Sequence, residues 1–556
     1  MQRREFLATA ATVGAAAVAA HAWAAATAPE ATIEVLLDEP IATIAPEIYG
    51  HFTEHLGGVI YDGVWVGEDS KIPNVRGIRS ALAEKLRAIN APVIRWPGGC
   101  FADSYDWRDG IGPRAKRPRR TNFWVDSAKR VPGSVQQFEP NIFGTAEFAD
   151  FCRQSGAAPY LAANLRSLPP LAFDQWVEFC NAPAGSTSYG DMRAASGSPS
   201  PYGVKYWGVG NESWGCGGDF TPEEYAAEYR RFTSWVPRYG VDLKFIASGP
   251  DGDDVDWTTR FFEATLGRRA VAPPFGWSVH NYTSGSSALD FDAPEAYATF
   301  ARGFTTEKIL LDHWAALEPF DRRRRVRLVV DEYGTWYGPG TQVDPSHIFG
   351  QQITMRDAIV TAFTLDIFNR HADKVGLAAC AQLINCINSL FLAHGADFLT
   401  TPNYHVFDLY QRHQGAQAVR TEFGAPAISY MPPAPAARRG GAPPAAPPAA
   451  NFWGLNGSAS VRDGRITITV VNPSQADSLE VEIRSWGGPL GAATARVLAA
   501  RDIHSHNTFE QPDAVRPRNL AVAAGAAGRL RCTLPPASVT AISAAGAAGS
   551  RPVRNR

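Results

Sequence analysis

The sequence predicts a (β/α)8 TIM barrel followed by a smaller antiparallel β-sandwich. Three observations support this fold class. The chain has 556 residues, which exceeds one ordinary domain. Strand-like and helix-like segments alternate over residues 46–400, whereas residues 401–546 contain short runs that alternate apolar and polar side chains. We therefore expect a large barrel in the N-terminal part of the chain and a smaller β domain after it.

The first 24 residues have the pattern of an export signal. Arg3 and Arg4 precede an Ala- and Val-rich run, and Ala22-Trp23-Ala24 offers a cleavage site. Paired arginines before a short apolar run resemble a twin-arginine signal peptide, with a general secretory signal as the alternative. We therefore expect an exported protein, either periplasmic or extracellular. The run is only weakly apolar and no later segment has membrane length, so no membrane association is expected.

Eight apolar runs are the candidate barrel strands, and a helical pattern separates most of them from the next. An open, doubly wound sheet is the alternative arrangement of the same elements. Eight alternating units favour the closed barrel. The eight runs span residues 47–55, 92–99, 159–166, 204–212, 244–250, 275–282, 326–334 and 376–384.

The intervening helices carry their own signals. Ile78, Leu82, Leu86 and Ile89 share one face of a predicted helix, as the core-facing side of an amphipathic helix requires. The segment 221–224 (TPEE) places Thr at the N-cap, Pro in the first turn and Glu three residues later, which is a capping box.

The C-terminal segment is predicted to be an antiparallel β-sandwich. RITITVV (465–471) and SLEVEIRSW (478–486) alternate apolar and polar residues, and Asn472-Pro473-Ser474 is a turn signal between them. The Pro- and Ala-rich stretch 431–450 cannot bury a core, so we expect a disordered surface loop. Residues 547–556 are assigned to a tail.

Composition excludes several classes of protein. A net charge of −2 gives no reason to expect nucleic acid or an anionic membrane as a partner. The seven cysteines are odd in number and lack CxxC spacing, which predicts free thiols rather than a disulfide framework or a zinc cage. The few histidines are not spaced as metal ligands, and GxSxG, HExxH and GxxxxGK[ST] motifs are missing. No metal and no cofactor is expected.

Two glutamates stand at the ends of predicted strands. Glu212 closes VKYWGVGNE (204–212), and Glu332 closes VRLVVDE (326–332). Retaining glycoside hydrolysis needs a carboxylic acid that protonates the leaving oxygen and a carboxylate that attacks the sugar carbon. Carboxylates at the carboxyl ends of barrel strands lie where TIM-barrel active sites form. We predict that Glu212 and Glu332 are the catalytic pair.

Asp331 is the alternative to Glu332. Side chains alternate along a strand, so only one of these neighbours is expected to enter the barrel mouth. We expect Glu332 to enter because it has the longer reach, and Asp331 to support the site. Other strand ends are also polar or aromatic, and their shared position at one rim favours a functional role. They are Glu54, Arg95, Trp96, Cys100, His280, Tyr282 and Gln382.

Six segments resemble the α-L-arabinofuranosidases of glycoside hydrolase family 51. The likeness runs with few breaks from near residue 33 to the end, and the order of the motifs makes it specific. The segments are IYGHFTEHLGGVIYDGVWV (48–66), RWPGGCFADSYDWRDGIGP (95–113), YWGVGNESWGCGG (206–218), HNY (280–282), DEYGTWY (331–337) and TPNYHVFDLY (401–410).

The resemblance implies a retaining, exo-acting enzyme that removes terminal non-reducing α-L-arabinofuranosyl residues from arabinan- or arabinoxylan-type polysaccharides or oligosaccharides. It also implies a homo-oligomer, and a jelly-roll-like sandwich to which a strand from residues 25–45 is added. Glu212 matches the acid/base and Glu332 the nucleophile of the family. Further positions match the subsite that holds the terminal arabinofuranose, and these are Glu54, Asn211, His280, Tyr282 and Gln382, with Trp336 as one wall.

Two features depart from the family pattern. Cys100 stands where relatives often have Asn, and a thiol is the weaker partner for a sugar hydroxyl. The loop 117–144 also differs, with Trp124 as a candidate aromatic contact to the leaving group. Two other functions stay open from the sequence. The first is a β-xylosidase or endo-β-glucanase on the same barrel, and the second is a non-catalytic exported carbohydrate-binding protein.

Overall fold

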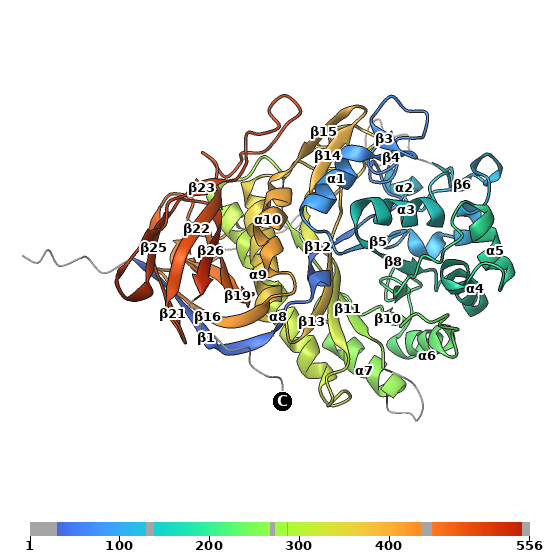
Figure 1. The fold of residues 1–556 in the computed structure, drawn as a ribbon, viewed down its shortest axis with the longest axis horizontal. Coiled ribbons are helices and arrows are strands. Elements are labelled where there is room, and N and C mark those ends of the chain that lie inside the picture. The colour runs from blue at the N-terminus through green and yellow to red at the C-terminus, as the bar shows by residue number, and fades with distance from the viewer. Residues whose placement is uncertain (1–29, 129–137, 267–272, 286, 435–446, 547–556) are drawn as a thin grey trace, which may run out of the picture.

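The computed structural model describes a closed barrel of eight parallel strands beside a ten-stranded C-terminal sheet (Figure 1). The predicted TIM barrel is confirmed, and the alternative of an open doubly wound sheet is wrong because the first and last barrel strands pair. The predicted signal segment 1–24, most of the Pro- and Ala-rich stretch and the tail lie outside the described residues. The described ranges are 30–128, 138–266, 273–285, 287–434 and 447–546.

All eight predicted runs form barrel strands in chain order. Six of these strands contribute one residue each to a packed interior cluster, which includes Val93, Tyr160 and Leu377. The interior is therefore a filled core, and open space lies at its ends. The strands are β2 (Gly50–Phe52), β5 (Val93–Trp96), β8 (Ala158–Ala163), β9 (Tyr206–Val209), β10 (Lys244–Ala247), β11 (Gly276–Ser284), β12 (Arg327–Trp336) and β13 (Val375–Cys380).

Helices cover the outside of the barrel, as the sequence patterns predict. In α1 (Ser80–Ala88), Leu82 and Leu86 are fully buried. The predicted capping box starts α6 (Pro222–Thr233), where the amides of Thr221 and Glu224 each donate to the other residue's side chain. The other main helices are α3 (Thr145–Ser155), α4 (Pro170–Asn181), α5 (Ser188–Ala195), α7 (Val255–Leu266), α8 (Ala293–Leu317), α9 (Met355–Arg370) and α10 (Pro402–Tyr410).

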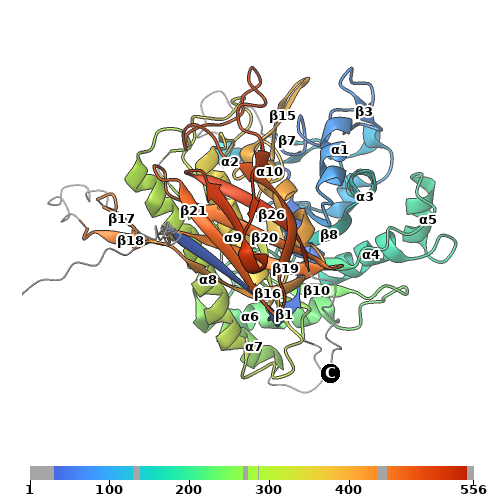
Figure 2. The same ribbon diagram turned by 60° about the vertical axis from the view of Figure 1, so that its left-hand side comes forward.

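The strand β1 (Ala31–Thr43) crosses to the C-terminal sheet. It lies between β16 (Gln417–Gly424), to which it is antiparallel, and β21 (Leu479–Trp486), to which it is parallel. Figure 2 shows this N-terminal strand among the C-terminal ones. The implied addition of an N-terminal strand to the sandwich is therefore confirmed.

The two strands that the sequence predicts in this domain are β20 (Arg465–Asn472) and β21. They are not paired with each other, because β20 lies between β19 and β26 while β21 lies between β1 and β25. Apolar side chains from both parts of the sheet, such as Ile468 and Ile483, meet in one buried cluster. The remaining strands are β19 (Asn456–Arg462), β22 (Leu490–Leu498), β23 (Arg518–Leu520), β24 (Ala523–Ala524), β25 (Leu530–Leu534) and β26 (Ser538–Gly546).

Helix α9 joins the two domains. It packs against barrel strand β12 and against sheet strands β19 and β20. Asp366 of α9 is fully buried and accepts hydrogen bonds from the hydroxyls of Ser458 (2.7 Å), Thr469 (2.6 Å) and Tyr410 (2.8 Å). Burial raises the pKa of Asp366 to about 6. Within the described ranges, no helix combines the length and apolar character needed to cross a bilayer.

Candidate active site

A pocket of about 410 Å³ opens at the carboxyl ends of the barrel strands. Four of the residues that the sequence singles out do not line it: Arg95, Trp96, Asn211 and Asp331. Trp96 is fully buried, and its indole N–H donates to His55 Nε2 at 3.0 Å. Trp124 and Trp214 contribute further aromatic surface, and Asp251 adds a carboxylate. The predicted residues in the wall are Glu54, Cys100, Glu212, His280, Tyr282, Glu332, Trp336 and Gln382.

Glu332 of β12 is held at both carboxylate oxygens. Arg95 Nη1 donates to Oε1 at 2.7 Å, and the Tyr282 hydroxyl donates to Oε2 at 2.8 Å. The side chain is 8% exposed. Two charged or hydroxyl donors fix the direction of the carboxylate and leave it little contact with bulk water.

Arg95 of β5 organises the floor of the pocket. Its guanidinium is buried, and Nη2 donates to Asn211 Oδ1 at 2.7 Å. Asn211 thus lies behind the pocket wall, where it contacts Arg95. The sequence offered a signal for Arg95, since it is a cation at the end of a predicted strand, but it did not identify this partner of Glu332.

Asp331 and Glu332 both face the barrel interior. Asp331 accepts hydrogen bonds from the Tyr160 hydroxyl (2.6 Å) and from Ser278, and its Oδ2 lies 3.4 Å from Arg95 Nε. The prediction that only one of these neighbours faces inward is wrong. Ser278 pairs with Val329 but His280 pairs with Glu332, so β12 contains one extra residue in this interval, a bulge that interrupts the alternation.

His280 of β11 lies between three carboxylates. Its Nδ1 is 3.0 Å from Glu212 Oε1 and 3.7 Å from Glu332 Oε2, and its Nε2 is 3.2 Å from Asp331 Oδ1. Burial opposes the charge, but the carboxylate of Glu332 and the hydrogen bonds to Asp331 and Glu212 raise the pKa of His280 to about 10. The imidazole is therefore a cation that donates at both nitrogens.

This charge state bears on metal binding. Glu212, His280 and Glu332 offer ligand atoms within 4.8 Å of one another. A protonated imidazole has no free lone pair for a metal ion, so the group fits a hydrogen-bonded network better. A second group comes from three separate segments, Asp62 with His347 and His394. Its carboxylate-to-nitrogen distances are 3.2 and 3.1 Å, which are hydrogen-bond distances.

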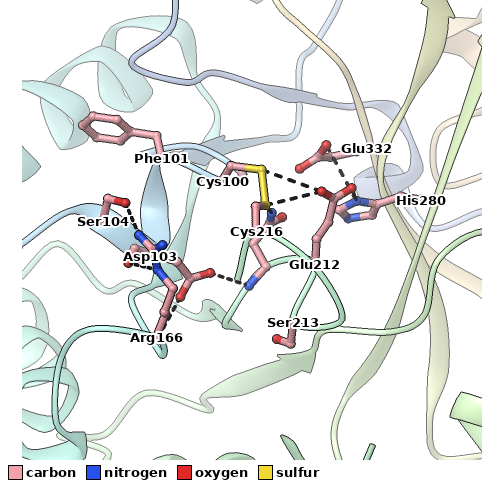
Figure 3. The surroundings of a disulfide bond; sticks show 12 residues. Cys100, Phe101, Asp103, Ser104, Arg166, Glu212, Ser213, Cys216, His280 and Glu332 are labelled. Atoms are coloured by element: carbon pink, nitrogen blue, oxygen red, sulfur yellow. Dashed lines mark hydrogen bonds and ion pairs between the residues drawn. A yellow bond between two sulfur atoms is a disulfide. The ribbon is translucent and has the colours of Figure 1, made fainter. Parts of the chain in front are cut away.

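Glu212 follows β9 on a turn with a left-handed backbone, since its φ is 40°. Such a conformation is uncommon outside glycine and concentrates at functional sites. Its Oε1 contacts His280 at 3.0 Å. Its Oε2 lies 3.5 Å from Cys216 Sγ and 3.8 Å from Cys100 Sγ (Figure 3).

Cys100 and Cys216 form a disulfide. The prediction of free thiols is therefore wrong for this pair, whereas the other five cysteines are free and buried. The two partners are 116 residues apart and follow different barrel strands, so their spacing carries no signature of pairing. Cys100 lines the pocket as a disulfide sulfur, without the thiol hydrogen that the sequence suggests.

Glu54 and Gln382 form another part of the pocket wall. Gln382 Nε2 donates to Glu54 Oε2 at 2.9 Å, while the amides of Gly99 and Phe101 donate to Oε1 at 3.1 and 3.0 Å. Burial, reinforced by the charge of Glu332, raises the pKa of Glu54 to about 7. This carboxyl can therefore exchange a proton near neutral pH.

Aromatic rings close the outer side. Trp336 packs edge-on against Tyr282, with centroids 5.2 Å apart, and against Phe349 at 5.3 Å. Trp124, from the predicted variable loop, packs against the same Phe349 at 5.6 Å. Phe349 was not singled out from the sequence, because it lies in a loop without a motif.

Comparison with known proteins identifies the family to which this chain belongs. Two family models match, the α-L-arabinofuranosidase 1 domain over residues 85–284 and the α-L-arabinofuranosidase C-terminal domain over residues 331–538. An intracellular exo-α-L-arabinofuranosidase of Bacteroides ovatus is 34% identical over 92% of this chain and 95% of its own length. The chain belongs to the α-L-arabinofuranosidases of glycoside hydrolase family 51.

Structures of family 51 arabinofuranosidases agree with this assignment. The enzyme from Xanthomonas axonopodis pv. citri is 35% identical, with a TM-score of 0.84 over 93% of this chain and all of the other. The protein is thus an enzyme, a glycoside hydrolase that acts on arabinose-containing glycans. The alternatives of a β-xylosidase, an endo-β-glucanase or a non-catalytic binding protein are not favoured by these relatives.

The prediction of an exported protein is wrong. Besides the B. ovatus relative, an enzyme of Streptomyces lividans that is 27% identical over 92% of this chain is named an intracellular exo-α-(1→5)-L-arabinofuranosidase. Paired arginines before an Ala-rich run form a short compositional pattern, which has little specificity by itself. Neither the signal peptide nor twin-arginine export is supported by the relatives of this family 51 arabinofuranosidase.

Proposed function

We propose that this family 51 arabinofuranosidase removes terminal non-reducing α-L-arabinofuranosyl residues with retention of configuration, with Glu332 as nucleophile and Glu212 as acid/base. One observation carries the assignment of the roles. Glu332 accepts a hydrogen bond on each oxygen, which stabilises an attacking anion. Glu212 accepts from His280 on Oε1, whereas its Oε2 lies beside two disulfide sulfurs that donate nothing and can therefore carry the proton of the acid.

The separation of the carboxyl groups supports retention. An oxygen of Glu212 lies within 4.8 Å of an oxygen of Glu332. Retaining glycosidases place their carboxyl groups about 5–5.5 Å apart, while inverting enzymes need about 6.5–9.5 Å to admit a water molecule. This oxygen-to-oxygen distance is shorter than the separation that an inverting enzyme needs, and it therefore favours retention.

The reaction then proceeds in two steps. Glu332 attacks the anomeric carbon and forms a covalent arabinosyl-enzyme, while Glu212 transfers its proton to the departing glycosidic oxygen. Glu212, now a carboxylate, takes a proton from water as that water attacks the anomeric carbon, and Glu332 leaves. Both glutamates regain their starting states.

The remaining wall residues are proposed to bind the furanose and the leaving group. Glu54 and Gln382 present oxygen and nitrogen atoms to sugar hydroxyls on one side. Trp336 supplies an apolar wall, and Trp124 is placed to contact the leaving group. Asn211 is proposed to act through Arg95, since its Oδ1 accepts from that guanidinium.

Azide rescue tests the two roles separately. We expect Glu332→Ala to lose activity on an aryl α-L-arabinofuranoside by about 10⁴-fold or more. Azide then attacks the substrate directly and yields the β-arabinofuranosyl azide, with inverted configuration. We expect Glu212→Ala plus azide to yield the α-azide, because the covalent intermediate still forms on Glu332.

The configuration of each azide product is read by NMR spectroscopy. An α-azide from Glu332→Ala, or wild-type rates in that variant, rejects the nucleophile assignment. Asp331→Asn is the matched control for the neighbouring carboxylate. It is expected to lower activity without giving a β-azide, because Glu332 is retained.

The assembly and partners are also proposed. We infer a homo-oligomer without nucleic-acid or membrane partners, supported by the family resemblance and by a net charge of −2. Light scattering of the purified protein checks the oligomer, and a monomer at micromolar concentration contradicts it.

A further inference from the structure

The disulfide joins two parts of the barrel rim that no backbone ladder connects. Cys100 follows β5, and Cys216 lies on the turn after β9. In the barrel, β8 separates β5 from β9. The covalent bond therefore spans an intervening strand, and the carboxyl group of Glu212 rests directly on it (Figure 3).

Hydrogen bonds to Asp103 also connect the loops after β5, β8 and β9. Asp103, three residues after Cys100, accepts a hydrogen bond from the backbone N–H of Asn211 at 3.0 Å. The same carboxylate accepts from the amides of Leu165 (2.7 Å) and Arg166 (3.1 Å), which follow β8. These bonds hold the base of the Glu212 turn. The disulfide holds its far end, beyond the left-handed residue Glu212 itself.

The chemistry of the Cys100–Cys216 disulfide also affects Glu212, the proposed proton donor. Disulfide sulfurs carry no hydrogen, so Cys100 and Cys216 present no donor to Glu212 Oε2, although they lie 3.8 and 3.5 Å away. Reduction by a dithiol such as dithiothreitol adds two electrons and two protons, which gives two thiols and the cyclic disulfide of the reagent. Each thiol is a weak donor and would stabilise the Glu212 carboxylate over the carboxylic acid.

We propose that the Cys100–Cys216 disulfide is a positioning element for Glu212, which keeps its carboxyl aimed at the glycosidic oxygen beside an aprotic surface. Reduction of this bond therefore weakens proton donation more than it weakens substrate binding or attack by Glu332. The inference rests on the proposed acid/base role of Glu212.

Leaving groups of different basicity test the proposal. A 2,4-dinitrophenolate departs without protonation, whereas an alkoxide or a sugar needs a proton from the acid. In Cys100→Ala/Cys216→Ala, we expect kcat/KM for methyl or (1→5)-linked arabinofuranosides to fall by about 10-fold or more, and kcat/KM for the dinitrophenyl glycoside to change by less than about 3-fold. Wild-type enzyme reduced with dithiothreitol is expected to show the same selective loss.

The pH profile gives a second readout that a general loss of stability would not produce. The other charged groups facing Glu212 are His280 from β11, Glu332 from β12 and Asp251 after β10. Reduction changes none of these groups. We expect the basic limb of the kcat/KM profile to move to lower pH in the reduced enzyme, because the thiols favour the ionised acid.

Three controls make the outcome decisive. Glu212→Ala must show the selective loss on unactivated glycosides, and if it does not, the acid/base assignment fails rather than this inference. Cys100→Ala/Cys216→Ala must be unaffected by dithiothreitol. Cys532→Ala, a free cysteine in the C-terminal sheet, must behave as wild type.

Two results overturn the inference. The first is an equal loss on all leaving groups in the folded double variant, and the second is no loss at all. If the double variant does not fold, the reduced wild-type enzyme decides the question by the same criteria. Thiol titration before and after dithiothreitol establishes that the bond was opened, and resistance of the bond to reduction leaves the decision to the variant.

Discussion

His280 shows how a single side chain sets the charge balance of the pocket. Three carboxyl groups surround it, and without a cation beside them the carboxylates of Asp331 and Glu332 would repel one another. Arg95 neutralises part of this charge from the floor. The imidazolium neutralises the rest at the level of the reacting groups, which is why its proton is held so firmly.

This charge balance predicts a pH-dependent stability. The pKa of His280 is about 10 in the folded protein and about 6.5 in the unfolded chain, so its protonation stabilises the fold fully below pH 6.5. That contribution is lost as the pH rises towards 10. We expect the difference in unfolding free energy between wild type and His280→Gln to be largest near pH 6 and to shrink by pH 10. Urea unfolding at several pH values measures it, and a difference that grows with pH contradicts the charge assignment.

At the scale of elements, the close approach of the loop after β5 to the end of β12 fixes the carboxylate of Glu332. A Cβ atom on Gly99 would lie 2.5 Å from Glu332 Oε1, a distance that side-chain carbons do not adopt. The glycine is required because the carboxylate of Glu332, which reaches across the barrel mouth from β12, occupies the space of a side chain. The backbone of the loop and the carboxylate of Glu332 are thus packed in direct contact.

We expect Gly99→Ala to displace the Glu332 carboxylate and to lower kcat/KM by about 100-fold, because small misplacements of reacting groups cost that much. Thermal unfolding should show that the fold is retained. Gly488→Ala is the matched control, since a Cβ there meets only Leu37 Cδ1, at an ordinary distance of 3.9 Å. Wild-type activity in Gly99→Ala would show that Glu332 does not need this exact position.

At the scale of the whole molecule, α9 makes the barrel and the C-terminal sheet one structural unit. Asp366 lies on the helix, and its three hydroxyl partners come from β19, β20 and α10. Because this carboxylate is buried, its hydrogen bonds cannot be exchanged for bonds to water without opening the domain interface.

We expect Asp366→Ala to lower the free energy of unfolding by roughly 2–3 kcal/mol, since it leaves buried hydroxyls without their acceptor. The kcat/KM of the folded variant should stay near that of wild type, because the pocket lies at the far end of the strands. Asp513→Ala, at an exposed carboxylate, should change stability by less than about 0.5 kcal/mol. An unchanged urea midpoint in Asp366→Ala would contradict the proposed role of this interface.

Much of this architecture could be predicted because parallel strands leave a strong signal. Each barrel strand is an apolar run, and catalytic side chains follow such runs, so Glu212, Glu332 and most wall residues were found from their positions. The inward orientation of both Asp331 and Glu332 could not be predicted, because it depends on one extra residue in β12 relative to β11. The Cys100–Cys216 pair was missed because the two cysteines come together only through the pairing of β5 and β9 with the strand between them, β8.

The position of β1 has a consequence for how the chain matures. During synthesis β1 leaves the ribosome before the barrel does, yet its neighbours β16 and β21 come after the last barrel strand. While the barrel is translated, β1 does not yet have its two partner strands, β16 and β21. The pairing of β1 with β16 and β21 can therefore be completed only after both of these strands have been synthesised, and it ties the N-terminal segment to the C-terminal sheet.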